Sequence, residues 1–143
     1  LGGEMSGHIF FNDDWYGFDD AIYSALRIIE ILSKTELTSH EVFNSYPKHF
    51  FTPEINLKVP EEEKFKIIDE LKTLINSSGY VLIDIDGIRL ENENSWGLIR
   101  ASNTSPNLVL RFEGEKESDL LEIKNYFKEL LSKIEIDLKL DFS

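Results

Sequence analysis

The clearest indication of the fold of this chain is the segment YVLIDIDGIRLENENSWGLIRASNTSPNLVLRFE, residues 80–113. Its apolar runs, separated by turn residues, predict four short strands at 80–84, 87–91, 95–101 and 108–113. A further strand is predicted at 54–59, because Ile55, Leu57 and Val59 alternate with polar residues. We therefore expect an antiparallel sheet of four to five strands.

Two amphipathic helices accompany the predicted strands. One opens at Pro60 and three glutamates and ends before Gly79, and its apolar positions are Phe65, Ile68, Leu71, Leu74 and Ile75. The other covers about residues 117–131, with Leu120, Ile123, Phe127 and Leu130 directed inward. The order strand, helix, strands, helix predicts an α+β domain in which both helices cover one face of the sheet. The tail at 134–142 is either a final strand or unstructured.

The first third of the chain has a different character. Residues 1–17 are rich in glycine and aromatic residues, and a helix with Ile22, Leu26 and Ile29 on one face is predicted at about 18–32. Asp19 and Asp20 lie at its start, where carboxylates favour the helix dipole. Residues 38–41 form a plausible capping box for a short helix that ends before Pro47, and residues 48–53 are interpreted as a linker.

The composition limits the possible functions. The chain has 27 acidic and 15 basic residues, a net charge of −12, so it repels nucleic acid and anionic membranes and we expect neither as a partner. It has no Cys, which excludes disulfides, thiolate metal sites and cysteine nucleophiles and is consistent with the cytosol. No apolar run is long enough to predict a membrane span. Because the chain opens on Leu1-Gly2-Gly3, we expect a fragment of a longer protein.

A window without acidic residues is the first sign of a binding site. Residues 94–112 contain no Asp or Glu, but they hold Arg100 and Arg111, two of the four arginines in the chain. Residues 101–107, between these arginines, are rich in short hydroxyl and amide side chains that suit a phosphate monoester. The alternative is that these residues are simply those that a hairpin loop contains.

A second cluster lies near the start of the chain. Glu4, Ser6 and His8 place a carboxylate, a hydroxyl and an imidazole within five residues of a glycine-flanked loop. The first two side chains suit sugar hydroxyls, and the imidazole titrates near neutral pH. The alternative is a turn with a surface histidine. No metal site is predicted, because the calcium-loop-like start at 84–87 lacks the remaining ligands.

Four ordered motifs resemble the α-D-phosphohexomutase superfamily, in particular its bacterial phosphomannomutase/phosphoglucomutase branch. They are GGEMSGH at 2–8, GFDD at 17–20, DGIR at 86–89 and RASNTSP at 100–106. The resemblance implies that residues 1–47 are the end of a sugar-binding third domain, a partial α/β domain. Residues 48–143 would then be a phosphate-binding fourth domain that is similar to the TATA-binding protein.

The resemblance also implies an activity. Such enzymes interconvert hexose 1-phosphate and 6-phosphate through a phosphoserine and a hexose 1,6-bisphosphate, with Mg²⁺, in the cytoplasm. The phosphoserine loop and the Mg²⁺ ligands are absent from this chain, so we expect it to be inactive without the missing N-terminal domains. The alternative is a phosphosugar-binding module without catalysis. The implied site residues are His8 for proton transfer, Glu4 and Ser6 for sugar hydroxyls, and Arg100, Ser102, Asn103 and Thr104 for the substrate phosphate.

Overall fold

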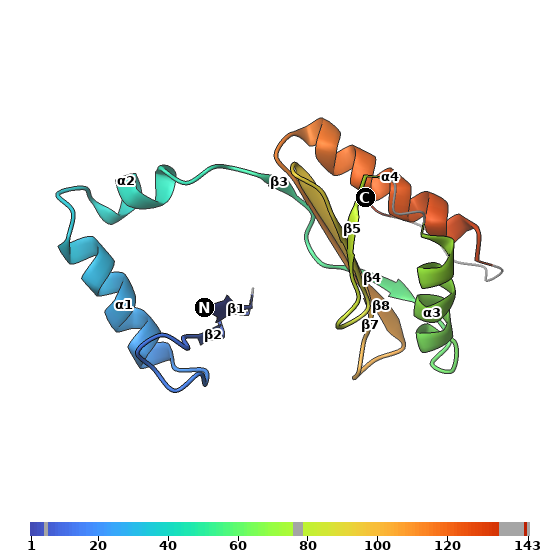
Figure 1. The fold of residues 1–143 in the computed structure, drawn as a ribbon, viewed down its shortest axis with the longest axis horizontal. Coiled ribbons are helices and arrows are strands. Elements are labelled where there is room, and N and C mark those ends of the chain that lie inside the picture. Colours follow the sequence, from blue (N-terminus) through green and yellow to red (C-terminus); the bar gives the residue numbers. More distant parts are fainter. Residues whose placement is uncertain (5, 76–78, 135–141, 143) are drawn as a thin grey trace. The chain divides into compact units, whose positions relative to one another are not determined.

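The computed structural model describes residues 1–4, 6–75, 79–134 and 142. The chain forms two compact units, Leu1–Pro47 and Lys48–Ser143 (Figure 1). No helix among the described ranges is both long and apolar enough to cross a membrane.

The second unit is built on an antiparallel sheet, which in the described part of the chain has six strands in the order β3-β8-β7-β6-β5, with β4 also paired with β8. The central pair joins each residue of β7 to a partner on β8, from Ser95 opposite Gly114 to Ala101 opposite Leu108. The strands are β3 (Phe50–Phe51), β4 (Ile55–Lys58), β5 (Val81–Ile83), β6 (Ile88–Glu91), β7 (Ser95–Ala101) and β8 (Asn107–Gly114).

The prediction of a linker at 48–53 is wrong at Phe50 and Phe51, because these residues form strand β3. With β3 included, the described part of the sheet has six strands where four to five were predicted. Phe50 and Phe51 pair with the end of β8, which extends to Gly114 and so offers a longer edge than predicted. The neighbouring Thr52 continues this pairing, because its N–H donates to the Phe112 carbonyl at 3.0 Å and its hydroxyl accepts the Phe112 N–H at 3.1 Å.

Helices α3 (Lys64–Leu74) and α4 (Glu117–Ser132) cover one face of this sheet (Figure 1). The predicted α+β architecture is therefore confirmed. Gly97 on β7 faces α4 so closely that a Cβ there would lie 2.6 Å from Phe127. Since side chains alternate along a strand, residues 95, 97, 99 and 101 point towards the helices, and Trp96, Leu98 and Arg100 point to the opposite face.

The inward face of α3 differs from the prediction. The sequence places Phe65 among the apolar positions of this helix, but the residue is 56% exposed. The helix begins at Lys64, after a turn at 61–63, and its buried residues are Lys64, Ile67, Ile68 and Leu71. This i, i+3, i+4, i+7 spacing defines the covered face and leaves Phe65 outside it. On α4, the predicted inward residues Ile123, Phe127 and Leu130 are buried.

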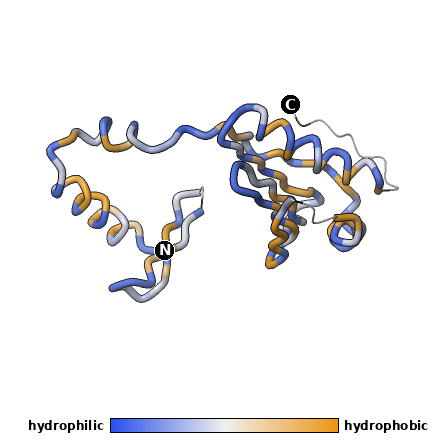
Figure 2. Tube along the Cα trace, turned by 45° about the horizontal axis from the view of Figure 1, so that its top comes forward, coloured by the Kyte–Doolittle hydropathy of each residue, from blue (hydrophilic) through white to orange (hydrophobic). Residues whose placement is uncertain are grey.

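The first unit contains a short hairpin and two helices. Strands β1 (Gly2–Gly3) and β2 (Ile9–Phe10) pair with each other and are followed by α1 (Ala21–Ser33) and α2 (Ser39–Asn44). Helix α1 begins after Asp20, whose carboxylate accepts the Tyr23 N–H at 2.9 Å and so caps the helix. The predicted capping box of α2, between Thr38 and Glu41, is present. Helix α1 is largely hydrophobic (Figure 2), but its apolar residues Ile22, Leu26 and Ile29 are exposed.

The tail at 134–142, for which the sequence predicts either a final strand or an unstructured segment, lies largely outside the described residues, which omit 135–141 and 143. Its described ends, Ile134 and Phe142, are buried in the core of the second unit.

Candidate functional site

The acid-free window forms the β7–β8 hairpin and its loop at 102–106. The loop is closed by the Ser102 N–H, which donates to the Asn107 carbonyl at 2.9 Å. The Ser102 hydroxyl is buried and organises the loop, because it accepts the Ser105 hydroxyl at 2.9 Å and the Thr104 N–H at 3.3 Å. Asn103 and Thr104 are exposed at the tip. The structure therefore forms a compact turn in which Asn103 and Thr104 face solvent close in sequence to Arg100, whereas the Ser102 side chain is turned into the loop.

Arg100 lies just before this loop, on the sheet face that the helices leave open. The structure places its guanidinium 3.8 Å from the Asp86 carboxylate. Both side chains are more than a third exposed, so this long ion pair holds the arginine only weakly. The guanidinium therefore remains available to an anion at the loop.

Arg111, the other arginine of the acid-free window, shares the open face with Arg100. The register places Arg100 opposite Val109 and Arg111 opposite Leu98, so the two arginines occupy diagonal positions on neighbouring strands. The Arg111 guanidinium lies 3.5 Å from the Glu54 carboxylate. The hairpin thus places two guanidinium groups on one face of a strongly acidic chain, each close to a carboxylate.

The sequence analysis missed a third basic residue, Lys64. Its side chain is almost fully buried at the start of α3, and its Nζ donates to the Ser102 carbonyl at 2.7 Å and to the Ser105 carbonyl at 3.4 Å. The Glu61 carboxylate lies 2.6 Å from the same nitrogen. A search for apolar residues at helical spacing passes over a lysine. The signal that could have found Lys64 is its position, because it completes the i, i+3, i+4, i+7 set of buried residues on α3.

In the first unit, Glu4, Ser6 and His8 lie in the loop between β1 and β2. The Glu4 N–H donates to the His8 carbonyl at 2.8 Å, and Gly7 makes the turn with a φ of 91°. The structure brings two of the predicted residues together, because the Ser6 hydroxyl donates to the Glu4 carboxylate at 3.0 Å. Both side chains are exposed, as hydroxyl-binding groups must be.

His8 points instead to Asp19, which the sequence analysis treated only as a helix-start residue. The His8 Nδ1 lies 2.5 Å from one Asp19 carboxylate oxygen, and the Ile9 N–H donates to the other at 3.1 Å. The hydrogen bond to Asp19 and its charge raise the pKa of His8 above its usual 6.5. The same hydrogen bond lowers the pKa of Asp19 below 3.8. The carboxylate orients the imidazole and favours its protonated form, which is the arrangement that a proton donor requires.

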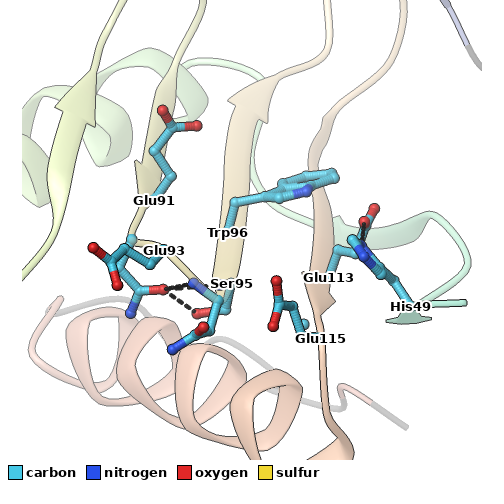
Figure 3. A pocket seen from close by; sticks show the side chains of 10 residues that line it. His49, Glu91, Glu93, Ser95, Trp96, Glu113 and Glu115 are labelled. Atoms are coloured by element: carbon cyan, nitrogen blue, oxygen red, sulfur yellow. Dashed lines mark hydrogen bonds and ion pairs between the residues drawn. The ribbon is translucent and has the colours of Figure 1, made fainter. Parts of the chain in front are cut away.

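A hollow of about 220 Å³ at the other end of the sheet contains none of the predicted site residues (Figure 3). Glu91, Glu93, Glu113 and Glu115 line it, and the His49 Nδ1 lies 2.6 Å from Glu113. So many carboxylates disfavour a phosphate there. Among the residues that the structure describes, no group of three His, Cys, Asp or Glu side chains is arranged to hold a metal ion.

Comparisons with known protein families match both units. The family model described as "Phosphoglucomutase/phosphomannomutase, alpha/beta/alpha domain III" matches residues 1–50. The family model described as "Phosphoglucomutase/phosphomannomutase, C-terminal domain" matches residues 54–130.

Individual relatives match over nearly the whole chain. A phosphomannomutase/phosphoglucomutase of Pseudomonas putida is 51% identical over 99% of this chain and 31% of its own length. A phosphoglucomutase of Neisseria meningitidis serogroup A is 45% identical over 92% of this chain and 29% of its own length. A solved phosphoglucomutase/phosphomannomutase family protein of Burkholderia thailandensis has a TM-score of 0.79 and 40% identity, covering 95% of this chain and 29% of that one. The chain thus spans less than a third of the length of these relatives.

Proposed function

The chain belongs to the phosphoglucomutase/phosphomannomutase family, and we propose that it is the C-terminal part of a mutase that interconverts hexose 1-phosphates and 6-phosphates. The resemblance inferred from the four sequence motifs is confirmed by these matches. The observation that carries the proposal is the hairpin loop at 102–106, an exposed polar turn beside Arg100 in an acid-free window of an acidic chain.

In the proposed reaction, an enzyme phosphoserine transfers its phosphoryl group to the free hydroxyl of a hexose phosphate and becomes a free serine. The bisphosphate then reverses its orientation and returns its other phosphoryl group to that serine. The phosphate that is not transferred must be held at either end of the sugar. Arg100 supplies charge-assisted hydrogen bonds for this task. Ser102, Asn103 and Thr104 supply neutral hydrogen-bond donors, which can bind the phosphate in either orientation of the sugar.

The first unit contributes the remaining proposed contacts. Glu4 and Ser6, which are hydrogen-bonded to each other, bind hydroxyls of the sugar ring. His8 exchanges a proton with the reacting hydroxyl, and the hydrogen bond between Asp19 and the His8 Nδ1 fixes the orientation of the imidazole ring. A protonated imidazole oriented in this way supports general acid catalysis.

The proposal assigns the nucleophilic serine, and the Mg²⁺ that would neutralise charge during transfer, to other parts of the longer protein, because the sequence of this chain has neither the phosphoserine loop nor the Mg²⁺ loop that the family resemblance implies. The proposal therefore includes the N-terminal domains as partners of this chain, a phosphosugar substrate, a hexose 1,6-bisphosphate as intermediate and activator, and a cytoplasmic location. The chain alone contributes binding and is inactive.

The test is a mutase assay on the full-length protein that contains this chain. Mannose 1-phosphate and glucose 1-phosphate are each supplied with Mg²⁺ and the matching bisphosphate, and ³¹P NMR follows formation of the 6-phosphates. Conversion of at least one substrate is expected. Binding of phosphosugars without conversion of either would replace the mutase with the alternative, a non-catalytic phosphosugar-binding module.

A further inference from the structure

We infer that Lys64 is a positioning residue for the phosphate loop, which it holds from inside the protein without contacting the substrate. The inference rests on the proposed function, namely that residues 100–104 bind the substrate phosphate. It adds a residue from α3, far from the loop in sequence, to the machinery of that site.

The contacts of Lys64 satisfy its ammonium group completely. Nζ has three hydrogens, and the structure provides three acceptors, the Ser102 carbonyl at 2.7 Å, the Ser105 carbonyl at 3.4 Å and a Glu61 carboxylate oxygen at 2.6 Å. The Phe65 ring lies 5.3 Å from the same atom. The residue is only 2% exposed. A buried ammonium that is fully paired in this way is held in one position, and it holds its partners in turn.

The packing of α3 does not by itself require a lysine here. The other members of its buried face are Ile67, Ile68 and Leu71, so an apolar side chain would serve the helix at position 64 as well. Burial of a charge is costly unless specific partners compensate for it. Two of the partners are carbonyls of the loop, which indicates that the lysine is there for the loop rather than for the core.

The position of these carbonyls explains the effect on phosphate binding. Ser102 and Ser105 flank the exposed tip that Asn103 and Thr104 form. Lys64 draws both carbonyl oxygens towards the helix, and therefore away from the place where they would repel an anionic ligand. It also places a positive charge directly behind the loop, which Glu61 partly neutralises.

The test uses steady-state kinetics of the full-length protein. Lys64→Met keeps most of the side-chain volume but removes the charge and the three donors. We expect it to raise the KM for the phosphosugar about tenfold and to leave kcat within threefold, because the loop binds the phosphate that is not transferred. Ile68→Ala, on the same buried face, is the matched control and should lose stability while its KM stays within twofold. An unchanged KM in Lys64→Met, or an equal rise in Ile68→Ala, would overturn the inference.

A second variant keeps the inference testable if Lys64→Met does not fold. The Glu61 side chain is exposed. Glu61→Gln removes the negative charge beside the Lys64 ammonium and leaves the hydrogen bonds from Lys64 to both loop carbonyls in place. We expect its KM to fall about twofold, and a KM that is unchanged or higher would count against Lys64.

If the proposed function is wrong, the wild-type full-length protein will show no turnover in the mutase assay. In that case amide hydrogen exchange decides on Lys64. Exchange of the Ser102 N–H at least tenfold faster in Lys64→Met than in Ile68→Ala supports the positioning role, and equal rates refute it.

Discussion

Gly87 lies directly against the backbone of Arg100. A Cβ at Gly87 would lie 2.3 Å from the Ile99 carbonyl oxygen and 2.7 Å from the Arg100 Cα. The φ of Gly87 is 84°. Only glycine combines that backbone conformation with such a close approach. The turn before β6 therefore determines where the end of β7, and with it Arg100, can lie.

Replacement of Gly87 by Ala should destabilise the second unit by about 3 kcal/mol, since it adds steric overlap to the cost of a positive φ. Gly79→Ala is the matched control, because Gly79 has a φ of 97° but, apart from its chain neighbours, no atom of the described residues lies within 4 Å of its Cβ position. It should cost only about 1 kcal/mol. Urea unfolding of the 143-residue chain, followed by circular dichroism, measures both values. Equal losses in the two variants would show that the backbone of Arg100 yields to the added methyl group.

Replacement of Asp19 by Asn should lower the pKa of His8 towards 6.5, because the hydrogen bond and the charge that raise it are both weakened. NMR titration of the His8 ring in the 143-residue chain measures this. Asp13→Asn is the control, since Asp13 pairs with Arg27 and not with His8. A His8 titration that does not change between the wild type and Asp19→Asn would contradict the pairing.

The same pair gives a direction for stability against pH. The pKa of His8 is raised on folding, so its contribution is fully present below about 6.5 and is lost as the pH rises through the folded value. The pKa of Asp19 is lowered, so its contribution is lost as the pH falls below 3.8 through the folded value. Between these limits the wild type should gain stability over Asp19→Asn, and the difference should shrink at higher pH.

The 143-residue chain by itself should not convert mannose 1-phosphate, even with Mg²⁺ and a bisphosphate activator. The covalent step needs a phosphorylated serine and charge neutralisation, which the proposal assigns to the rest of the protein. A coupled assay for mannose 6-phosphate with purified chain measures this. Turnover above a no-enzyme control that survives repeated purification would show that the chain carries its own phosphoryl-transfer group.

Much of the fold could be predicted because local rules and tertiary packing agree. The alternation around Ile55 and Leu57, the turn residues between β5 and β8 and the capping box at Thr38 each have a short-range cause. Strand β3 could not be predicted, because Phe50 and Phe51 are ordered by pairing with β8, about sixty residues away. The exposed position of Phe65 depends on where α3 begins, which composition alone leaves open.

The candidate site shows the same division. Motifs that are continuous in sequence, such as Ser102-Asn103-Thr104, could be identified from the residues and their resemblance. Contacts between distant residues could not. Lys64 reaches across 38 residues to Ser102, and no periodicity of α3 indicates its target. Asp19 is a conventional helix-start residue until the hairpin brings His8 to it.

Arg100→Ala in the full-length protein should lower kcat/KM by about one to three orders of magnitude. The net charge of −12 repels a dianionic substrate, so local donors must overcome the mean field. Charge-assisted hydrogen bonds to phosphate contribute about 1.5–3 kcal/mol each, and the guanidinium can form two. The ion pair that Arg100 gives up is long and exposed, so its loss adds little. The effect should therefore fall on substrate binding rather than on folding.

Two further variants separate the guanidinium from charge in general. Arg100→Lys should recover only part of the activity, because an ammonium lacks the planar fork that binds two phosphate oxygens. Arg111→Ala tests the other arginine of the same face, whose guanidinium lies by Glu54, and it should cost less than Arg100→Ala. Steady-state kinetics with equal amounts of folded protein compare the three. The two arginines share one face of the sheet, so either could bind the phosphate. If kcat/KM of Arg100→Ala stayed within twofold of the wild type while Arg111→Ala abolished turnover, Arg111 and not Arg100 would be the phosphate-binding residue.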